Sequence, residues 1–285
     1  MAVMEINSIC VCGAGTMGRG IAQACAQAGF ATTLFDVNTE VLESASSTIE
    51  KSLAQLTAKG KITGDKAART LQLISYSDDI HSCLADIFIE AIVEKTAAKI
   101  SLFNQLAELN HGDAIFASNT SSLSVTEIAN GVLHPERVIG LHFFNPATLM
   151  KLVEVVKTPY TNEATSGTAT ALVRQLNKVP VLCTDAPGFI VNRVARPFYI
   201  ESLRLLEEGL TTAEQADRLL ESAGFRMGPF KLMDLIGHDI NYAVSSSVWE
   251  QLQKPERLRP SAVQEEKVKS GKLGKKSGEG FYRYE

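Results

Sequence analysis

The segment that most constrains the fold is residues 8–36, where a glycine-rich turn joins two patterns of different period. The apolar run SICVC, residues 8–12, is followed by GAGTMG at 13–18 and by the helical pattern RGIAQACAQAGF. A second run, ATTLFD, is rich in β-branched and aromatic residues and ends at Asp36. Strand, glycine turn, helix, strand and terminal acid in this order predict the first βαβ unit of a doubly wound sheet.

Each part of this turn has a physical task in binding a dinucleotide. Gly13 permits the tight turn, Gly15 lets backbone N–H groups approach a pyrophosphate, and Gly18 lets the helix pack close to the sheet. The helix N-terminus offers unpaired N–H groups and a positive dipole end. Asp36 can accept hydrogen bonds from a ribose 2′-hydroxyl and would repel a 2′-phosphate, which favours NAD over NADP. A turn without a ligand is the alternative. The expected cofactor contacts are Gly13, Ala14, Gly15, Thr16, Met17, Gly18 and Asp36.

Length and composition limit the remaining possibilities. A chain of 285 residues favours two domains. A net charge of −4 provides no basic surface for nucleic acid or an anionic membrane. The start has no leader pattern, and no apolar run is long enough to span a bilayer. The five cysteines are odd in number and form no C-x-x-C pair, which indicates free thiols in a reducing compartment and no metal site. We therefore expect a cytoplasmic protein.

The alternation of strand and helix patterns changes near residue 185. Strands and helices alternate from residue 8 to residue 184, and only helical patterns follow. The expected fold class is α/β, with a Rossmann-type, mostly parallel sheet domain over 1–184 and an all-α domain over 185–285. The finer expectations are a helix over 39–58 capped by Thr39 and running into KGKITGDK, a strand LQLISY, one helical pattern over 228–252, and a tail, 272–285, that is either solvated or closes over an anionic ligand.

Polar residues follow two apolar runs where each run ends. ADIFIEAIVE ends in Glu90 and Glu94, and AIFASNTSS ends in the polar residues 119–122. Ligands bind at the carboxyl ends of strands in doubly wound folds. Glu94 is therefore a ligand candidate, and Glu90 is a weaker one. The 119–122 cluster is either a turn or part of a site, and Ser124 or Ser122 is expected to cap the short helix after it.

A histidine and a carboxylate flank a proline corner in GLHFFNPATLMKLVEVVK, residues 140–157. Asn145-Pro146 interrupts two apolar runs, because proline cannot donate to a strand ladder and restricts the residue before it. The chain can fold back there and bring His142 and Glu154 together. A histidine oriented by a carboxylate is a common general base near neutral pH. The alternative is a buried histidine between two strands.

Eight motifs in this order make the chain resemble the short-chain L-3-hydroxyacyl-CoA dehydrogenases, which include bacterial 3-hydroxybutyryl-CoA dehydrogenases. The resemblance covers essentially the whole chain. It rests on GAGTMG at 13–18, EAIVE at 90–94, ASNTSSL at 117–123, GLHFFNP at 140–146, KLVEVV at 151–156, PGFIVNR at 187–193, MGPF at 227–230 and GKKSGEGFY at 274–282.

The resemblance implies reversible, NAD-dependent oxidation of a (3S)-3-hydroxyacyl-CoA by a homodimer that associates through its C-terminal domain. It implies a catalytic site of His142, Glu154, Ser121 and Asn192, and a cofactor site that also includes Glu94, Lys99, Asn119, Asn145 and Lys276. Ser121, Asn145 and Asn192 would contact the acyl-CoA substrate, and Ser52 and Lys59 match CoA-binding positions more loosely. Lys95 departs from the family pattern, which usually has Asn or Asp there.

The resemblance leaves acyl-chain length and pathway open, with butanoate and fatty-acid metabolism as the expected setting. Two rival functions remain. One is an oxidoreductase of a free hydroxy acid, which would need no CoA. The other is a dinucleotide-binding protein that has lost catalysis, although the joint presence of His142, Glu154, Ser121 and Asn192 favours an active enzyme.

Overall fold

The structure is a computed structural model that describes residues 4–110 and 114–284. Residues 1–3 and Glu285, the last residue of the expected tail, lie outside the described residues. The chain divides into two compact units, Met1–Asp185 and Ala186–Glu285. We describe each unit by itself.

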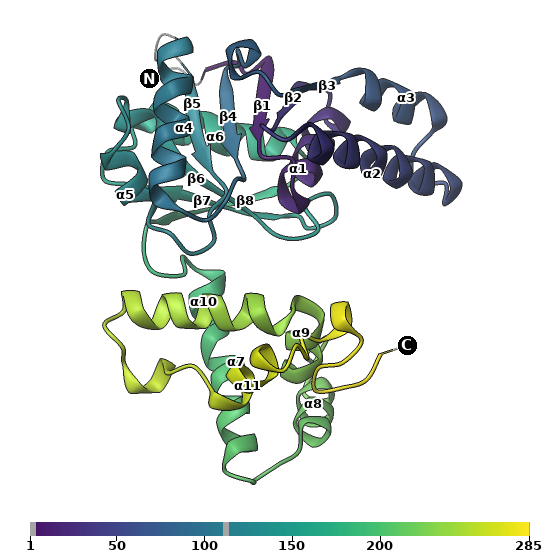
Figure 1. Cartoon of the computed structure of the whole chain (residues 1–285), viewed down its shortest axis with the longest axis vertical. Coiled ribbons are helices and arrows are strands. Elements are labelled where there is room, and N and C mark those ends of the chain that lie inside the picture. Colours follow the sequence, from purple (N-terminus) through teal and green to yellow (C-terminus); the bar gives the residue numbers. More distant parts are fainter. Residues whose placement is uncertain (1–3, 111–113, 285) are drawn as a thin grey trace. The chain divides into compact units, whose positions relative to one another are not determined.

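The N-terminal unit contains one eight-stranded sheet (Figure 1). Its strands stand in the order β3-β2-β1-β4-β5-β6-β7-β8. All neighbouring strands are parallel except β6 and β7, which are antiparallel. This confirms the predicted α/β, mostly parallel fold. The strands are β1 Ser8–Cys12, β2 Ala31–Phe35, β3 Ile74–Ser77, β4 Ile87–Glu90, β5 Ile115–Ser118, β6 Val138–Phe143, β7 Leu152–Lys157 and β8 Val179–Thr184.

The strand order reverses at β1, which positions the ligand crevice. Ile9 of β1 pairs with Thr32 of β2 on one side and with Ile87 of β4 on the other. The chain therefore leaves β1 toward one edge of the sheet and returns to continue toward the other. In such sheets ligands bind outside the carboxyl ends of the strands at this switch point. The ends of β1, β2, β4, β5 and β6 carry most of the predicted site residues.

The helices of this unit are α1 Thr16–Gln27, α2 Thr39–Ala58, α3 Gly64–Gln72, α4 Thr96–Leu109, α5 Val125–Asn130 and α6 Glu163–Gln175, with short 3-10 turns at Ile80–Ser82 and Pro135–Arg137. Helices α2 and α3 lie side by side and project beyond the β3 edge of the sheet (Figure 1).

For this unit the structure corrects two local expectations and decides between two alternatives in a third. The strand expected at LQLISY begins only at Ile74, because the preceding residues belong to α3, which starts after the Thr63 cap. Asn38 caps α2 in place of Thr39, since its side chain accepts the N–H groups of Glu40 and Val41. Of the two serines expected to cap α5, Ser124 does so.

The core explains the near-continuous apolar strands. Val11, Ile87 and Ile89 have no exposed surface, because helices cover both faces of a parallel sheet. On α1, Ile21 and Ala22 are equally buried and pack in the same cluster. Close packing of α1 on β1 holds the glycine turn between them in place.

The C-terminal unit is a bundle of helices around a smaller core of Tyr199, Leu203, Phe230 and Met233. Its helices are α7 Val191–Glu207, α8 Ala213–Ser222, α9 Pro229–Ile236, α10 His238–Gln251 and α11 Ala262–Lys269, with 3-10 turns at Glu256–Leu258 and Lys275–Ser277. The single helical pattern expected over 228–252 is in fact α9 and α10. They separate at Gly237, whose φ of 102° ends the first helix. Across residues 4–110 and 114–284, no helix is long and apolar enough to cross a membrane.

Candidate active site

The glycine turn has the shape that the sequence predicts for a pyrophosphate site. Gly13 has a φ of +99°, which favours glycine, and its N–H donates to the Phe35 carbonyl at 2.7 Å. A Cβ at Gly18 would lie 1.7 Å from the Gly13 carbonyl oxygen, so only glycine lets the helix start this close to the turn. A Cβ at Gly15 would meet nothing within 4 Å, which leaves this side of the turn open.

The N-terminus of α1 and the end of β2 add the polar groups that a dinucleotide needs. The helix begins after Gly15 without a side-chain cap and without an acidic residue in its first turn, so its N–H groups face no competing carboxylate there. Asp36 Oδ2 accepts the Ala14 N–H at 2.8 Å, and Oδ1 accepts the Asn38 N–H at 3.0 Å. Each oxygen retains a second lone pair with which a ribose hydroxyl could bond. These residues fit NAD.

His142 and Glu154 lie directly opposite each other on the antiparallel strands β6 and β7. The Nδ1 atom of His142 is 2.6 Å from Oε2 of Glu154, and both side chains are buried. The Phe144 ring packs with its centroid 4.5 Å from that of the imidazole. The proline corner folds the chain back as expected, and the corner peptide Asn145-Pro146 is cis. A buried carboxylate at Nδ1 can orient the ring and stabilise an imidazolium.

The thiol of Cys183 also lies near this pair, but it is unreactive. Cys183 is on β8, which pairs with β7. Burial and the negative charges of Glu154 and Asp185 raise the pKa of Cys183 to about 11. The thiolate is the reactive form, so this cysteine remains an unreactive thiol near neutral pH.

The polar cluster after β5 is tied to both neighbouring strands. The side-chain carbonyl of Asn119 accepts the N–H of Phe143, at 2.9 Å, next to His142. Glu94 Oε1 accepts the Thr120 hydroxyl at 2.5 Å and the Ser121 N–H at 3.2 Å. The structure thus brings Asn119 beside the strand of His142 and Glu94 beside the turn of Ser121.

Charge and hydrogen bonding keep Glu94 ionised. Burial alone raises the pKa of Glu94, but the charge of Lys99 and hydrogen bonds from Thr120 and Ser122 outweigh it, so the pKa lies below its ordinary value. Lys99 itself is 1% exposed and its ammonium lies between Glu90 and Glu94. Direct contact of Lys99 with the cofactor stays a prediction.

A buried lysine that the sequence analysis missed anchors the corner after β6. Lys178 Nζ donates to the carbonyl oxygens of Ala147 and Met150, at 2.6 and 2.7 Å. Asn145 is exposed at the start of the same loop, and Ala147 packs beside Gly20 of α1. In the sequence Lys178 is an isolated lysine between a helical pattern and VPVLCT, so nothing distinguishes it from a solvated one.

The two looser candidates for CoA binding lie on α2. Ser52 is half-buried and its hydroxyl accepts a hydrogen bond from Gln23 Nε2 of α1, at 3.1 Å. Lys59 is the C-cap residue of α2 and its side chain is exposed. These contacts connect Ser52 to the packing of α2 on α1, and they leave the CoA assignment of both residues a prediction.

The remaining candidates, Asn192 and Lys276, belong to the C-terminal unit. Asn192 is in the first turn of α7, and its carbonyl accepts Arg196 Nε at 2.9 Å. Lys276 pairs with Asp239 of α10 at 2.6 Å. The arrangement holds the Lys276 ammonium beside Gly237, where a Cβ would approach it to 3.0 Å.

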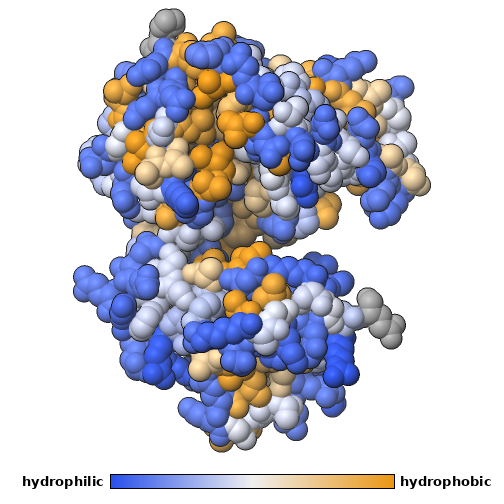
Figure 2. Space-filling model, in the orientation of Figure 1, coloured by the Kyte–Doolittle hydropathy of each residue, from blue (hydrophilic) through white to orange (hydrophobic). Residues whose placement is uncertain are grey.

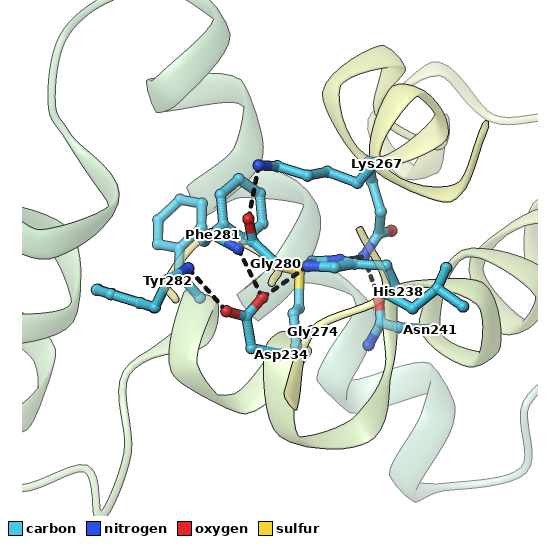
Figure 3. A network of polar contacts seen from close by, with 12 residues as sticks. Asp234, His238, Asn241, Lys267, Gly274, Gly280, Phe281 and Tyr282 are labelled. Carbon is cyan, nitrogen blue, oxygen red and sulfur yellow. Dashed lines mark hydrogen bonds and ion pairs between the residues drawn. The ribbon is translucent and has the colours of Figure 1, made fainter. Parts of the chain in front are cut away.

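One buried carboxylate, Asp234 of α9, fastens the carboxyl-terminal segment that carries Lys276 (Figure 3). Its Oδ1 accepts the Phe281 N–H at 2.9 Å and lies 2.7 Å from His238 Nε2. Its Oδ2 accepts the Tyr282 N–H and the Tyr284 hydroxyl, both at 2.9 Å. A solvated tail is therefore wrong for these residues, and closure over an anionic ligand stays a prediction. No sequence pattern marked Asp234.

Comparisons with known proteins give the family of both parts of the chain. Residues 8–186 match the model of the 3-hydroxyacyl-CoA dehydrogenase NAD binding domain, and residues 188–284 match that of the C-terminal domain of the same family. The chain is 45% identical to the 3-hydroxyadipyl-CoA dehydrogenase of Escherichia coli (strain K12) over 98% of its length, although it spans only 59% of that protein.

Two further relatives are matched along nearly their whole length. The chain is 42% identical to a probable 3-hydroxybutyryl-CoA dehydrogenase of Bacillus subtilis (strain 168), over 99% of both chains. It is also similar to the crystal structure of (S)-3-hydroxybutyryl-CoA dehydrogenase PaaH1 from Ralstonia eutropha. That comparison has a TM-score of 0.94 and 35% identity, and covers 99% of this chain and 100% of the other.

Proposed function

The chain belongs to the 3-hydroxyacyl-CoA dehydrogenase family, whose N-terminal domain binds NAD, and from that premise we propose that it reversibly oxidises (3S)-3-hydroxyacyl-CoA to 3-oxoacyl-CoA. The observation that carries the proposal is the pairing of His142 Nδ1 with Glu154 Oε2 at 2.6 Å across β6 and β7. A secondary alcohol loses one proton and one hydride on oxidation, and this pair can take the proton.

In the proposed mechanism His142 is the general base. Its second ring nitrogen, Nε2, receives the proton of the substrate 3-hydroxyl. Glu154 holds the ring by Nδ1 and stabilises the imidazolium as it forms. NAD, when bound, supplies the acceptor for the hydride from the alcohol carbon. In the reverse direction the imidazolium returns its proton to the oxygen of the 3-oxo group.

The residues proposed to hold NAD are those at the strand ends of the N-terminal unit. The turn of residues 13–18 and the N-terminus of α1 suit the pyrophosphate, and Asp36 suits the ribose hydroxyls. Glu94, Lys99, Asn119 and Asn145 complete the proposed cofactor site on this unit. Lys276, on the C-terminal unit, is proposed only from its match to a cofactor position of the family. Because the charge of Asp36 repels a 2′-phosphate, NADPH should give a much lower kcat/KM than NADH.

The residues proposed to hold the acyl-CoA are Ser121 and Asn192, with Asn145, Ser52 and Lys59. The Ser121 turn is supported on Glu94, so its hydroxyl can be offered to a substrate oxygen in a defined place. Positioning of this kind raises the rate without any proton transfer. Lys59 offers an exposed ammonium, which suits a CoA phosphate.

The proposed acyl group is the four-carbon 3-hydroxybutyryl group. It is the group named in the relatives from Bacillus subtilis and Ralstonia eutropha, which the chain matches over 99–100% of their lengths. A 3-hydroxyadipyl group is the second candidate, because a protein of that name is 45% identical. The 3-hydroxyadipyl group is two carbons longer and ends in a carboxylate, so a comparison of kcat/KM for acetoacetyl-CoA and 3-oxoadipyl-CoA separates the two candidates.

We propose further that the chain forms a homodimer through its C-terminal unit. Val194, Leu219 and Ile240 of this unit are each more than half exposed, at 71%, 70% and 51%. Figure 2 shows apolar patches among the polar surface of the same unit. Exposed apolar side chains such as these can form a homodimer interface where they lie together on one face. A mass of one chain by sedimentation equilibrium at micromolar concentration would contradict the dimer.

The test of the function is the oxidation of NADH by the purified chain. NADH should be consumed with acetoacetyl-CoA and not with free acetoacetate. Turnover of free acetoacetate at a comparable kcat/KM would instead favour the rival oxidoreductase of hydroxy acids. Tight NADH binding without turnover of either compound would favour a protein that has lost catalysis.

A further inference from the structure

The last residue of β4, Glu90, has no role in the proposed chemistry, yet it forms a buried ion pair with Lys99, one of the proposed cofactor residues. Lys99 Nζ of α4 lies 2.5 Å from Glu90 Oε1, and the two side chains are 1% and 0% exposed. The Ile92 N–H also donates to Oε1, and the Ser118 hydroxyl of β5 donates to Oε2, both at 2.8 Å. Glu90 is thus held by β4, β5 and α4 together.

Stability alone does not account for this pair. Burial raises the pKa of Glu90, even though Lys99, Ser118 and Ile92 act in the opposite direction. Taking two charges out of water costs about as much as their attraction returns, and apolar residues of similar size are often equally stabilising. A buried ion pair such as this is better explained by a role in fixing the position of neighbouring side chains.

The ammonium of Lys99 reaches a second carboxylate, and that carboxylate supports the turn of Ser121. Lys99 Nζ is 3.1 Å from Glu94 Oε2. The other oxygen of Glu94, Oε1, accepts the Thr120 hydroxyl, the Ser121 N–H and the Ser122 hydroxyl, at 2.5, 3.2 and 3.0 Å. A continuous path of polar contacts therefore leads from Glu90 to the turn.

We propose that Glu90 is a positioning residue of the dehydrogenase: it holds Lys99, and through Lys99 it sets the carboxylate of Glu94 and the turn that carries Ser121. This inference rests on the proposed function. Lys99 is also one of the proposed cofactor residues, but its ammonium is 1% exposed and lies between the two carboxylates, so its part in this network is to hold Glu94 in place. Without the charge of Glu90, the ammonium has Glu94 as its remaining carboxylate and draws it away from residues 120–122.

A double-mutant cycle tests the path from Glu90 through Lys99. The variants are Glu90→Gln, Lys99→Met and the double variant, with kcat and KM measured for acetoacetyl-CoA. We expect each single variant to lose about 10- to 100-fold in kcat/KM, the scale for a displaced positioning group. If Glu90 acts through Lys99, the double variant loses no more than Lys99→Met does. If the double variant instead shows the product of the two single losses in kcat/KM, Glu90 and Lys99 act independently and the proposal is overturned.

Asp86→Asn is the matched control, because Asp86 directly precedes β4 and so lies at the opposite end of that strand from Glu90. Asp86 Oδ2 accepts the Asn7 and Ser8 N–H groups at 2.8 Å and so joins the start of β4 to that of β1. This variant should lower the urea midpoint and leave kcat and KM unchanged. If the Glu90 variants behave like Asp86→Asn, Glu90 is merely structural and the proposal is wrong.

Amide hydrogen exchange tests the same network by a measurement that does not depend on enzymatic turnover. The amides of residues 120–123 should exchange faster in Lys99→Met and in Glu90→Gln than in the wild-type chain, and unchanged protection would contradict the path. If a single variant does not fold, the double variant, whose buried groups are neutral, is compared with the wild type. Wild-type kinetics and protection in that variant would then overturn the inference. A wild-type chain inactive on acetoacetyl-CoA refutes the proposed function alone, because the exchange result still decides this proposal.

Discussion

The imidazole of His142 and the carboxylate of Glu154 meet through Nδ1 and Oε2 at 2.6 Å, with the two residues in register on antiparallel strands. Because each is held by its own strand ladder, their separation depends on the backbone of the sheet and little on side-chain freedom. A general base built in this way needs no movement of its orienting group during the reaction.

His142→Gln should lower kcat by about 10²–10⁴-fold, the usual effect of removing a general base. Glutamine keeps a polar group of similar reach but cannot take up the proton. The Kd for NADH, from fluorescence titration, should stay within about threefold, because the turn of residues 13–18 is untouched. Turnover close to that of the wild type would remove His142 from the proposed role.

Glu154→Gln should lower kcat by up to about 10⁴-fold, the loss found when the carboxylate of a serine protease triad is neutralised. The amide keeps the shape of the side chain but removes the charge that stabilises an imidazolium. The pH profile of kcat/KM should change in form as well as height. An identical profile would mean that Glu154 is not coupled to the base.

Two alanine variants of the glycine turn should differ in whether they lose stability as well as NADH binding. In Gly15→Ala the new Cβ meets nothing within 4 Å and φ is −63°, so the urea midpoint should stay unchanged while NADH binding weakens. In Gly18→Ala the Cβ would lie 1.7 Å from the Gly13 carbonyl oxygen, so stability should fall as well. Equal NADH affinity in Gly15→Ala and the wild type would argue against a pyrophosphate at this turn.

Lys178→Met should reduce stability by about 1–3 kcal/mol, because the Ala147 and Met150 carbonyl oxygens lose their buried donor. The loop that begins at Asn145 would become less ordered, and KM for acetoacetyl-CoA or NADH should rise. Lys151→Met is the control, since Lys151 is exposed in the segment just after this loop. Indistinguishable behaviour of the two variants in urea unfolding and kinetics would show that the anchor has no effect.

The Asp234 carboxylate should make the C-terminal unit sensitive to acid. Burial raises its pKa, but hydrogen bonds from His238, Phe281, Tyr282 and Tyr284 outweigh burial, and the folded pKa is lowered. A lowered pKa stabilises the fold above the unfolded value of about 4, and this contribution is lost as the pH falls through the folded value.

Asp234→Asn should therefore lower the free energy of unfolding at pH 7 by about 1–3 kcal/mol. The difference from the wild type should begin to shrink below about pH 4 and should be lost only below the lowered folded pKa of Asp234, where the wild-type carboxyl is uncharged too. Glu43→Gln, at an exposed position of α2, is the control and should change neither. A destabilisation by Asp234→Asn that is the same at pH 7 and pH 3 would contradict this origin.

Local sequence patterns were enough to predict those parts of the protein that depend on neighbouring residues. The glycine spacing of 13–18, the acid at Asp36 and the apolar runs predicted the βαβ unit and its cofactor, because each motif is local. The corner at Asn145-Pro146 predicted that His142 and Glu154 could meet, since two strands joined by a short connection pair with each other. The cap of α2, the extent of α3 and the break at Gly237 were not predicted, because several local patterns were compatible with each stretch.

Contacts between polar residues that are distant in the sequence could be read only from the folded chain. Glu90, Lys99 and the Ser121 turn come from β4, α4 and the end of β5, and their contacts depend on which strand ends lie side by side. Lys178 and Asp234 each hold a segment 28 to 50 residues away in the sequence. A buried charge needs hydrogen-bonding partners, and these partners come from whichever segments the fold brings next to it. A local sequence pattern does not show which segments those are.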